Sequence, residues 1–182
     1  IPIQTGGGGF GVRARLKRFD ERRCPGDVFI LWDPYGAGGN HLPDWVISRP
    51  IWVDRPGMTP VLAGFCCNRA HQSDIGGGLA GTYNPEATEI WHEGIRLPPL
   101  RLVEQGTMRQ DLWRLLLLNS RTPDLMDGDL RAMLGSTRIG VERVADLARE
   151  LGVETMVEFI ASILDHGERR LRSALRTLPA GH

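Results

Sequence analysis

The spacing of the hydrophobic residues in this chain changes near Thr107. Before this point, short runs of β-branched and aromatic residues stand between glycines and prolines, which is typical of strands joined by loops. After it, hydrophobic residues recur at every third or fourth position, as on one face of a helix. The chain is therefore predicted to have an α+β fold, with a β-rich half over residues 1–105 and a helical half over residues 106–182.

A length of 182 residues supports one domain with a sizeable core, so we expect a single domain over residues 1–182. Residues 27–32 are predicted to form a buried strand and residues 12–19 a short helix. In the helical half, the hydrophobic positions are expected to face the core. They are Leu112, Leu115, Leu116, Leu130, Leu134, Val141, Val144, Leu147, Leu151, Met156, Phe159, Ile160, Ile163, Leu164, Leu171 and Leu175.

Two hydrophobic runs, residues 45–53 and 61–67, flank a segment rich in proline and glycine at residues 54–60. Such a segment reverses the chain, so a β-hairpin is predicted. The hairpin begins just after Asp44 and ends just before His71. Because a hairpin returns the chain to its starting end, the loops that carry these two residues are expected to meet.

Polar side chains at the two ends of this hairpin form the main candidate for a functional site. His41 and Asp44 precede the first strand, and His71 and Asp74 follow the second. Imidazole nitrogen and carboxylate oxygen together suit divalent ions such as zinc, manganese or ferrous iron, and three such ligands leave positions open for substrate. Ordinary hydrogen-bonded loop residues give the same short pattern, so that interpretation stays open. Glycines at 38–39 and 76–78 would let the backbones approach closely.

Other motifs have simpler interpretations. The glycine run at 6–9 lacks a following Gly-Lys-Ser or Gly-Lys-Thr, so tight turns are favoured over a nucleotide site. Cys66 and Cys67 lie in a hydrophobic strand, where burial raises the pKa of a thiol, so structural cysteines are favoured over a nucleophile. Glu89 and Glu93 are spaced to share a helical face, which indicates either a functional carboxylate pair or a short exposed helix.

Composition argues against several classes of protein. Acidic and basic residues both number 22, so nothing favours nucleic acid or an anionic membrane surface as a partner. Three cysteines are too few for a disulfide framework, and a cytoplasmic location is expected. No uninterrupted apolar run is long enough for a membrane span. Because the chain has neither an initiating Met nor a signal sequence, it is expected to be a piece of a longer protein.

Several separated segments occur in a distinctive order along the chain. They are residues 26–30 (GDVFI), 33–39 (DPYGAGG), 41–44 (HLPD), 68–71 (NRAH), 74–77 (DIGG), 87–99 (ATEIWHEGIRLPP) and 128–132 (GDLRA), ahead of 138–140 (RIG). Taken together, these segments resemble the hydantoinase B/oxoprolinase family, and the resemblance spans nearly the whole chain.

The resemblance implies an ATP-dependent enzyme that opens cyclic amides such as hydantoins, 5-oxoproline and lactams. The alternative is the carboxylation of ketones such as acetone and acetophenone, because both kinds of member share these motifs. It also implies a hetero-oligomer with a hydantoinase A-type subunit that binds ATP. By the resemblance, a divalent metal, zinc or manganese, falls on His41, Asp44 and His71. Asp74 would then act as a catalytic carboxylate that orients an imidazole or takes a proton from water.

Three positions depart from the usual pattern of the family. Trp32 stands where an Asn usually precedes Asp-Pro-Tyr, Gln4 stands at the place of a His, and Gln72 replaces a second His after His71. Family members are also several times longer than this chain. These departures keep another hypothesis open, in which the chain is a non-catalytic subunit that retains the fold and a partner-binding surface.

Overall fold

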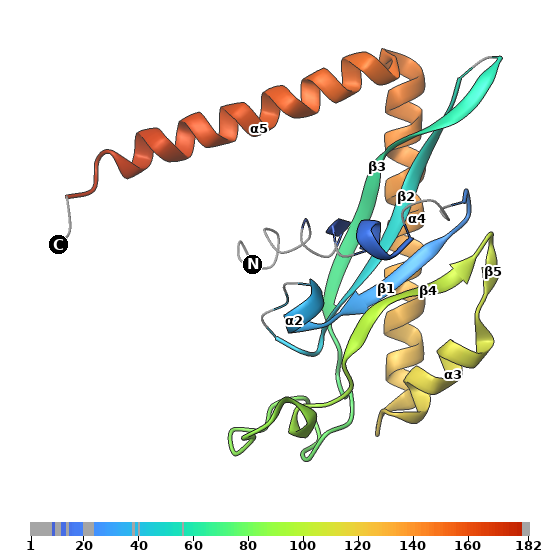
Figure 1. Cartoon of the computed structure of the whole chain (residues 1–182), viewed down its shortest axis with the longest axis vertical. Coiled ribbons are helices and arrows are strands. Elements are labelled where there is room, and N and C mark those ends of the chain that lie inside the picture. Colours follow the sequence, from blue (N-terminus) through green and yellow to red (C-terminus); the bar gives the residue numbers. More distant parts are fainter. Residues whose placement is uncertain are drawn as a thin grey trace.

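The structure is a computed structural model that describes residues 9, 12–13, 15–19, 24–37, 39, 41–55 and 57–179. Its first half is built around an antiparallel sheet, and its second half consists of helices (Figure 1). This is the α+β fold that the change in hydrophobic spacing predicts. The described residues of the predicted helix over 12–19 are helical. Gln4 and the first three glycines of the run at 6–9 lie outside the described residues.

The sheet has the strand order β3-β2-β1-β4-β5. The strands are β1 (Val28–Trp32), β2 (Asp44–Arg55), β3 (Met58–His71), β4 (Leu97–Glu104) and β5 (Thr107–Met108). All residues of the central strand β1 are buried, which confirms the predicted buried strand. The predicted hairpin is also confirmed, although its strands are longer than expected, because only residues 56–57 separate β2 from β3.

The helical half begins slightly later than predicted. A turn at residues 105–106 folds β5 back on β4, where Val103 pairs with Met108, so residues 107–108 belong to the sheet. The helices that follow are α3 (Gln110–Leu118), α4 (Pro123–Leu151) and α5 (Val153–Leu175). Two short elements, α2 (Pro34–Ala37) and the 3-10 turn η1 (Ile90–His92), lie in the loops of the first half.

Helix α4 lies across one face of the sheet and contacts β2 and β3 (Figure 1). Its residues Met126, Leu130, Met133 and Thr137 follow one another at steps of four, three and four, and all are buried. This spacing places them on one side of the helix, against the hydrophobic core of the sheet. Burial of each large hydrophobic side chain stabilises this layer by about 1.5–3 kcal/mol. The sheet is thereby held rigid beneath the loops at its ends.

Most hydrophobic residues of helix α5 do not face the core, contrary to the prediction. Helix α4 ends at Gly152, whose positive φ of 85° suits glycine, and α5 then projects away from the sheet (Figure 1). Within α5, which is described throughout, only Met156 is buried. The exposed hydrophobic residues are Val157, Phe159, Ile160, Ile163, Leu164, Leu171 and Leu175. The prediction that these residues face the core of the chain is therefore wrong, because α5 projects away from the sheet.

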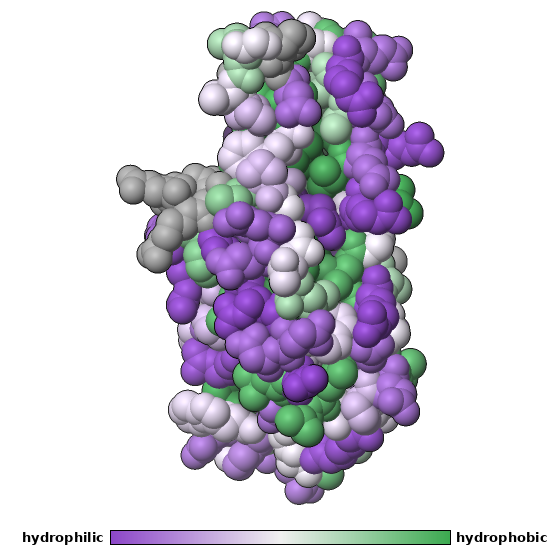
Figure 2. All heavy atoms as spheres, turned by 90° about the vertical axis from the view of Figure 1, so that its right-hand side faces the viewer, coloured by the Kyte–Doolittle hydropathy of each residue, from purple (hydrophilic) through white to green (hydrophobic). Residues whose placement is uncertain are grey.

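Figure 2 turns the molecule so that the side with α3 and α4 faces the viewer. Hydrophilic side chains cover much of this side, with hydrophobic patches between them. Among the helices of the described residues, none combines the length and the hydrophobicity that a membrane span requires.

Candidate functional site

The β2–β3 hairpin brings two of the predicted ligands into contact. Asp44 is the first residue of β2, His71 is the last residue of β3, and the strand register pairs them directly. His71 Nδ1 lies 3.2 Å from Asp44 Oδ1, with the Asp44 side chain buried and the His71 side chain 49% exposed. The two residues therefore lie within strands, at the start of β2 and at the end of β3, whereas the sequence predicted them on loops. A buried carboxylate thus orients an imidazole that reaches the surface.

His41 completes a pair of imidazoles at this end of the hairpin. Its ring centroid lies 5.0 Å from that of His71, and the two rings are tilted by 34°. The buried Trp32 fixes the backbone of His41, because the indole Nε1–H donates a hydrogen bond to its carbonyl oxygen. The Trp32 ring also fills the space beside Gly39, where a Cβ would lie 2.4 Å from Trp32 Cε2. Trp32 therefore positions the loop that carries His41.

Thr82 is a member of the site that the sequence analysis missed. Its Oγ1 lies 2.9 Å from His71 Nε2, on the side of the ring opposite Asp44. If His71 Nδ1–H donates to the Asp44 carboxylate, then Nε2 accepts a hydrogen bond from the Thr82 hydroxyl. Thr82 is buried and has φ 61°, a strained conformation for a β-branched residue, of the kind that often marks functional sites. No sequence motif marks this residue.

Asp74 lies at the base of the glycine-rich loop that leads to Thr82. Its carboxylate accepts hydrogen bonds from the backbone N–H groups of Gly76 and Gly81 and forms a 3.0 Å ion pair with Arg121. Burial by itself would raise the pKa of Asp74, but the hydrogen bonds from Gly76, Arg121 and Gly81 outweigh it and hold the pKa below its usual value. Its catalytic role stays a prediction, and these contacts favour positioning of the loop.

Arg69 places a second charge beside the site. It lies two residues before His71 on β3, and its guanidinium carbon sits 3.9 Å from the centroid of the Trp32 ring. Its guanidinium nitrogens are buried and have no hydrogen-bond partner among the described residues. Burial lowers the pKa of Arg69, and the negative charge of Asp44 opposes that shift. In the sequence, Arg69 is marked only by its place in the NRAH segment.

The glycines at 76–78 allow close backbone contact, but with the segment around η1 and not with the loop that carries His41. Gly77 has φ 81°, and a Cβ there would lie 2.5 Å from the carbonyl oxygen of His92. The next residue, Gly78, donates a 2.8 Å backbone hydrogen bond to the same oxygen. Glu89 and Glu93 cap the two ends of the single turn η1 instead of sharing the face of an α-helix. That part of the interpretation is wrong, because η1 is too short to provide such a face.

A pocket of about 390 Å³ lies between loops of the first half of the chain. It is lined by Leu42, the neighbour of His41 in the sequence, and by Pro34, Tyr35, Ala87, Thr88, Glu89, Ile90 and Glu93. Its lining comes from three of the family-like segments, at residues 33–39, 41–44 and 87–99. This pocket is therefore the candidate space for a small substrate.

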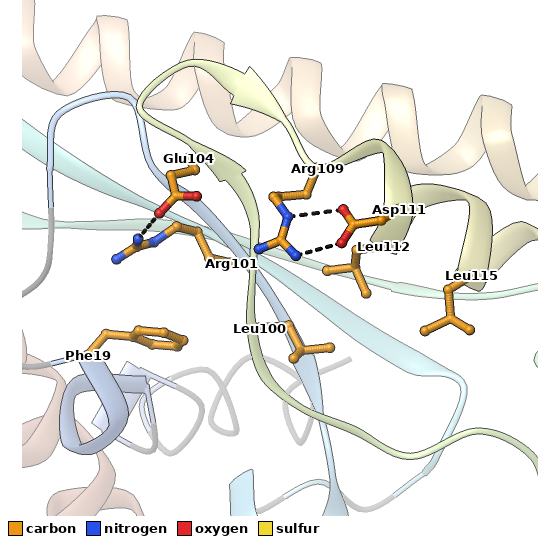
Figure 3. Close-up of a pocket in the computed structure, with 8 residues that line it drawn as sticks. All are labelled: Phe19, Leu100, Arg101, Glu104, Arg109, Asp111, Leu112 and Leu115. Atoms are coloured by element: carbon orange, nitrogen blue, oxygen red, sulfur yellow. Dashed lines mark hydrogen bonds and ion pairs between the residues drawn. The ribbon is translucent and has the colours of Figure 1, made fainter.

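A second pocket, of about 470 Å³, lies between β4 and α3 and is shown in Figure 3. Its charged residues pair with one another, Arg101 with Glu104 and Arg109 with Asp111. The hydrogen bonds from Arg109 lower the pKa of Asp111 to about 2. Because these charges are already paired, this pocket offers no set of groups poised for chemistry.

The cysteines behave as predicted. Cys66 and Cys67 lie in β3, and burial raises the pKa of both thiols. A thiol with a raised pKa carries little thiolate near neutral pH, which makes it a poor nucleophile. The structure thus supports the structural interpretation of this pair.

The three predicted metal ligands lie together, and their donor atoms suit a borderline divalent ion. In the structure, however, both nitrogens of His71 have protein partners, Asp44 and Thr82. Across the described parts of the chain, no three His, Cys, Asp or Glu side chains converge where they could hold an ion. The ligand role of His41, Asp44 and His71 stays a prediction.

Comparison with known proteins places this geometry in context. The chain matches the model of the hydantoinase B/oxoprolinase family over residues 1–182. It is 32% identical over 181 residues to the beta chain of the caprolactamase of Pseudomonas jessenii, covering 100% of this chain and 30% of that protein. It is 28% identical over 184 residues to the putative B-type subunit of a D-/L-hydantoinase of Pseudomonas sp. (strain NS671). That match covers 99% of this chain and 30% of the relative.

The fold is also similar to that of a solved structure. The crystal structure of an ATP-dependent caprolactamase from Pseudomonas jessenii matches with a TM-score of 0.86 and 32% sequence identity. The match covers 100% of this chain and 30% of the other. The chain thus spans about 30% of the length of these relatives.

Proposed function

The chain belongs to the hydantoinase B/oxoprolinase family, and from this membership we propose that it is the B-type portion of an ATP-dependent cyclic amide hydrolase. The observation that carries the proposal is the contact of Asp44 with His71 beside His41. A pocket lined by Leu42, the neighbour of His41 in the sequence, is of a size that fits a small ring. Two of the relatives are named as subunits of a caprolactamase and of a hydantoinase, which supports ring opening as the reaction.

Some residues of the site orient the imidazole rings, and the rings themselves are proposed to exchange protons with the substrate and water. Asp44 orients the ring of His71, and Trp32 fixes the backbone of His41. The ring nitrogens of His41 have no hydrogen-bond partner among the described residues, so they are available to a proton or a metal ion. Ring opening requires that water lose a proton and that the amide nitrogen gain one. We assign this exchange to the exposed edge of the imidazole pair.

His41, Asp44 and His71 are the residues that would hold a divalent ion, with zinc or manganese as the expected metal. Such an ion would polarise the amide carbonyl or lower the pKa of a water molecule. Asp74 supports the site by holding the loop that ends at Thr82. It thereby acts on the imidazole pair through Thr82 and not by direct contact.

The ATP-binding function is assigned to a separate A-type subunit. The two relatives are named as the beta and the B-type members of their enzymes, which implies companion subunits in those proteins. By analogy, the present chain works within a hetero-oligomer in which the companion activates the amide with ATP. The activated amide would then be opened at the imidazole pair.

The proposal is tested by reconstitution with an A-type subunit. ATP hydrolysis is measured over a panel of hydantoin, 5-oxoproline, caprolactam, acetone and acetophenone, with and without bicarbonate. We expect stimulation by a cyclic amide that is lost in Asp44→Ala and retained in Asp54→Ala, an exposed acidic residue near the far end of the same strand. Stimulation only by a ketone with bicarbonate would instead indicate a carboxylase. A stable complex without substrate-dependent turnover would indicate a non-catalytic subunit.

A further inference from the structure

Helix α5 carries a hydrophobic stripe with a seven-residue repeat. The stripe alternates steps of three and four, which is the spacing of the two core positions of a coiled coil. Its members are Val157, Ile160, Leu164, Gly167, Leu171 and Ala174. Leu164 and Leu171 are 69% and 62% exposed. The repeat therefore runs along the exposed side of the projecting helix.

This chain alone does not explain why α5 is stable. Helices gain most of their stability from packing of a hydrophobic face, and an isolated helix of this length is marginal in water. Within the described residues, α5 is anchored at its first turns, where Met156 packs with Ile51, Val53 and Ala148. After these first turns, the large hydrophobic residues of the stripe are exposed to solvent. Exposed hydrophobic patches of this kind mark interaction surfaces.

Gly167 gives a second, independent indication of a partner. A Cβ at this position would meet nothing within 4 Å, so packing among the described residues does not require a glycine there. Glycine inside a helix is less favourable than alanine, because it loses more backbone freedom on folding. Close approach of another helix is a physical reason to keep this position small.

Two antiparallel copies of α5 satisfy the size pattern of the stripe. When Leu164 of one copy faces Gly167 of the other, Val157 faces Ala174 and Ile160 faces Leu171. The two-fold symmetry repeats each contact. Large side chains then lie opposite small ones at the centre and at both ends of the stripe.

The charges on α5 favour the same orientation. Residues 153–165 of α5 carry Glu154, Glu158 and Asp165 and neither Arg nor Lys. Residues 166–175 carry Arg169, Arg170 and Arg172, with Glu168 as the only acidic residue. An antiparallel arrangement sets the acidic half of one copy against the basic half of the other, whereas a parallel arrangement sets like charges together.

We propose that α5 is a self-association surface on which a second copy of this chain packs antiparallel, with Leu164 of each copy over Gly167 of the other. The surface lies on the projecting helix and involves none of the site residues. This inference therefore does not depend on the proposed function.

The first test is the association state of the purified chain by analytical ultracentrifugation. We expect a dimer whose dissociation constant rises at least ~30-fold in Leu164→Glu, because this residue lies at the centre of the contact. The matched control is Ile139→Glu, an exposed hydrophobic residue of α4, which should leave the dimer intact. Circular dichroism of each variant checks that the chain is folded. A wild-type chain that stays monomeric at its highest soluble concentration overturns the proposal.

The second test determines the orientation of the helices. Chains with Leu164→Cys and with Gly167→Cys are oxidised separately and as a mixture, and the wild-type chain serves as the background for its own cysteines. Antiparallel packing predicts a disulfide-linked dimer that forms mainly in the mixture. Efficient cross-linking of Leu164→Cys to itself would indicate parallel packing and overturn the proposal.

Discussion

Asp44 and His71 face each other across the first pair of the β2–β3 ladder, although 27 positions separate them in the sequence. The pair lies at the open end of the hairpin, opposite the turn between Arg55 and Met58. The pairing of the two strands therefore fixes the distance between the carboxylate and the ring. A site built on strand ends is more rigid than one built on loops alone. The chemistry proposed for this chain depends on that rigidity.

Thr82 is predicted to fix the second nitrogen of His71. Replacing Thr82 with Val removes the hydroxyl but keeps the shape, so His71 Nε2 loses its hydrogen-bond donor. We expect a change in the ¹⁵N chemical shift of Nε2 and a loss of about 0.5–1.5 kcal/mol in the free energy of unfolding. Thr82→Ser, which keeps the hydroxyl, should retain the wild-type shift. Identical spectra for Thr82→Val and the wild type would show that the hydroxyl does not bond to the ring.

Asp74 is predicted to make stability depend on pH in the acidic range. Because its pKa is lowered in the folded state, its contribution is present above the unfolded pKa, about 3.9, and is lost as the pH falls through the folded pKa. Asp74→Asn should lower the free energy of unfolding near neutral pH by about 1–3 kcal/mol. It should also flatten the acid limb of the stability curve, measured by urea unfolding at a series of pH values. Asp54→Asn, an exposed control, should change neither.

Gly140 is predicted to be required for the packing of α4 on β3. A Cβ at this position would lie 2.3 Å from Cys66 Sγ, so Gly140→Ala should destabilise the fold by about 1–3 kcal/mol. Gly135→Ala, in the same helix, meets nothing within 4 Å and should stabilise the fold by about 0.5–1 kcal/mol. Thermal unfolding measures both effects.

A double variant separates the clash at Gly140 from other effects. Cys66→Ala removes the sulfur that a new Cβ would meet, so it should largely rescue Gly140→Ala. If the two substitutions were simply additive, the close contact between α4 and β3 would not be the cause of the loss.

The sequence predicts the parts of the site that depend on local signals. The proline and glycine residues between positions 54 and 60 predict the reversal, and the hydrophobic runs on either side predict its strands. Together they are enough to bring Asp44 and His71 to one place. Trp32 is different, because a buried tryptophan is predictable from its strand, but its bond to the carbonyl of His41 depends on the path of a loop.

Two other features could not be predicted, for different physical reasons. The contact of Thr82 with His71 depends on how the glycine-rich loop folds back, and the glycines on that loop allow many paths. The stripe on α5 shows from its period that one face is hydrophobic, but the period does not say what covers that face. In this chain the turn at Gly152 directs the face away from the sheet.

The most direct test of the proposed site is the metal content of the purified chain, measured by inductively coupled plasma mass spectrometry. We compare the wild type with His41→Ala, His71→Ala and the control His92→Ala, a histidine of the exposed turn η1. If His41, Asp44 and His71 form one metal centre, the wild type and His92→Ala should carry about one zinc or manganese ion per chain, whereas His41→Ala and His71→Ala should lose it. Stoichiometric metal that survives both His41→Ala and His71→Ala would contradict the account.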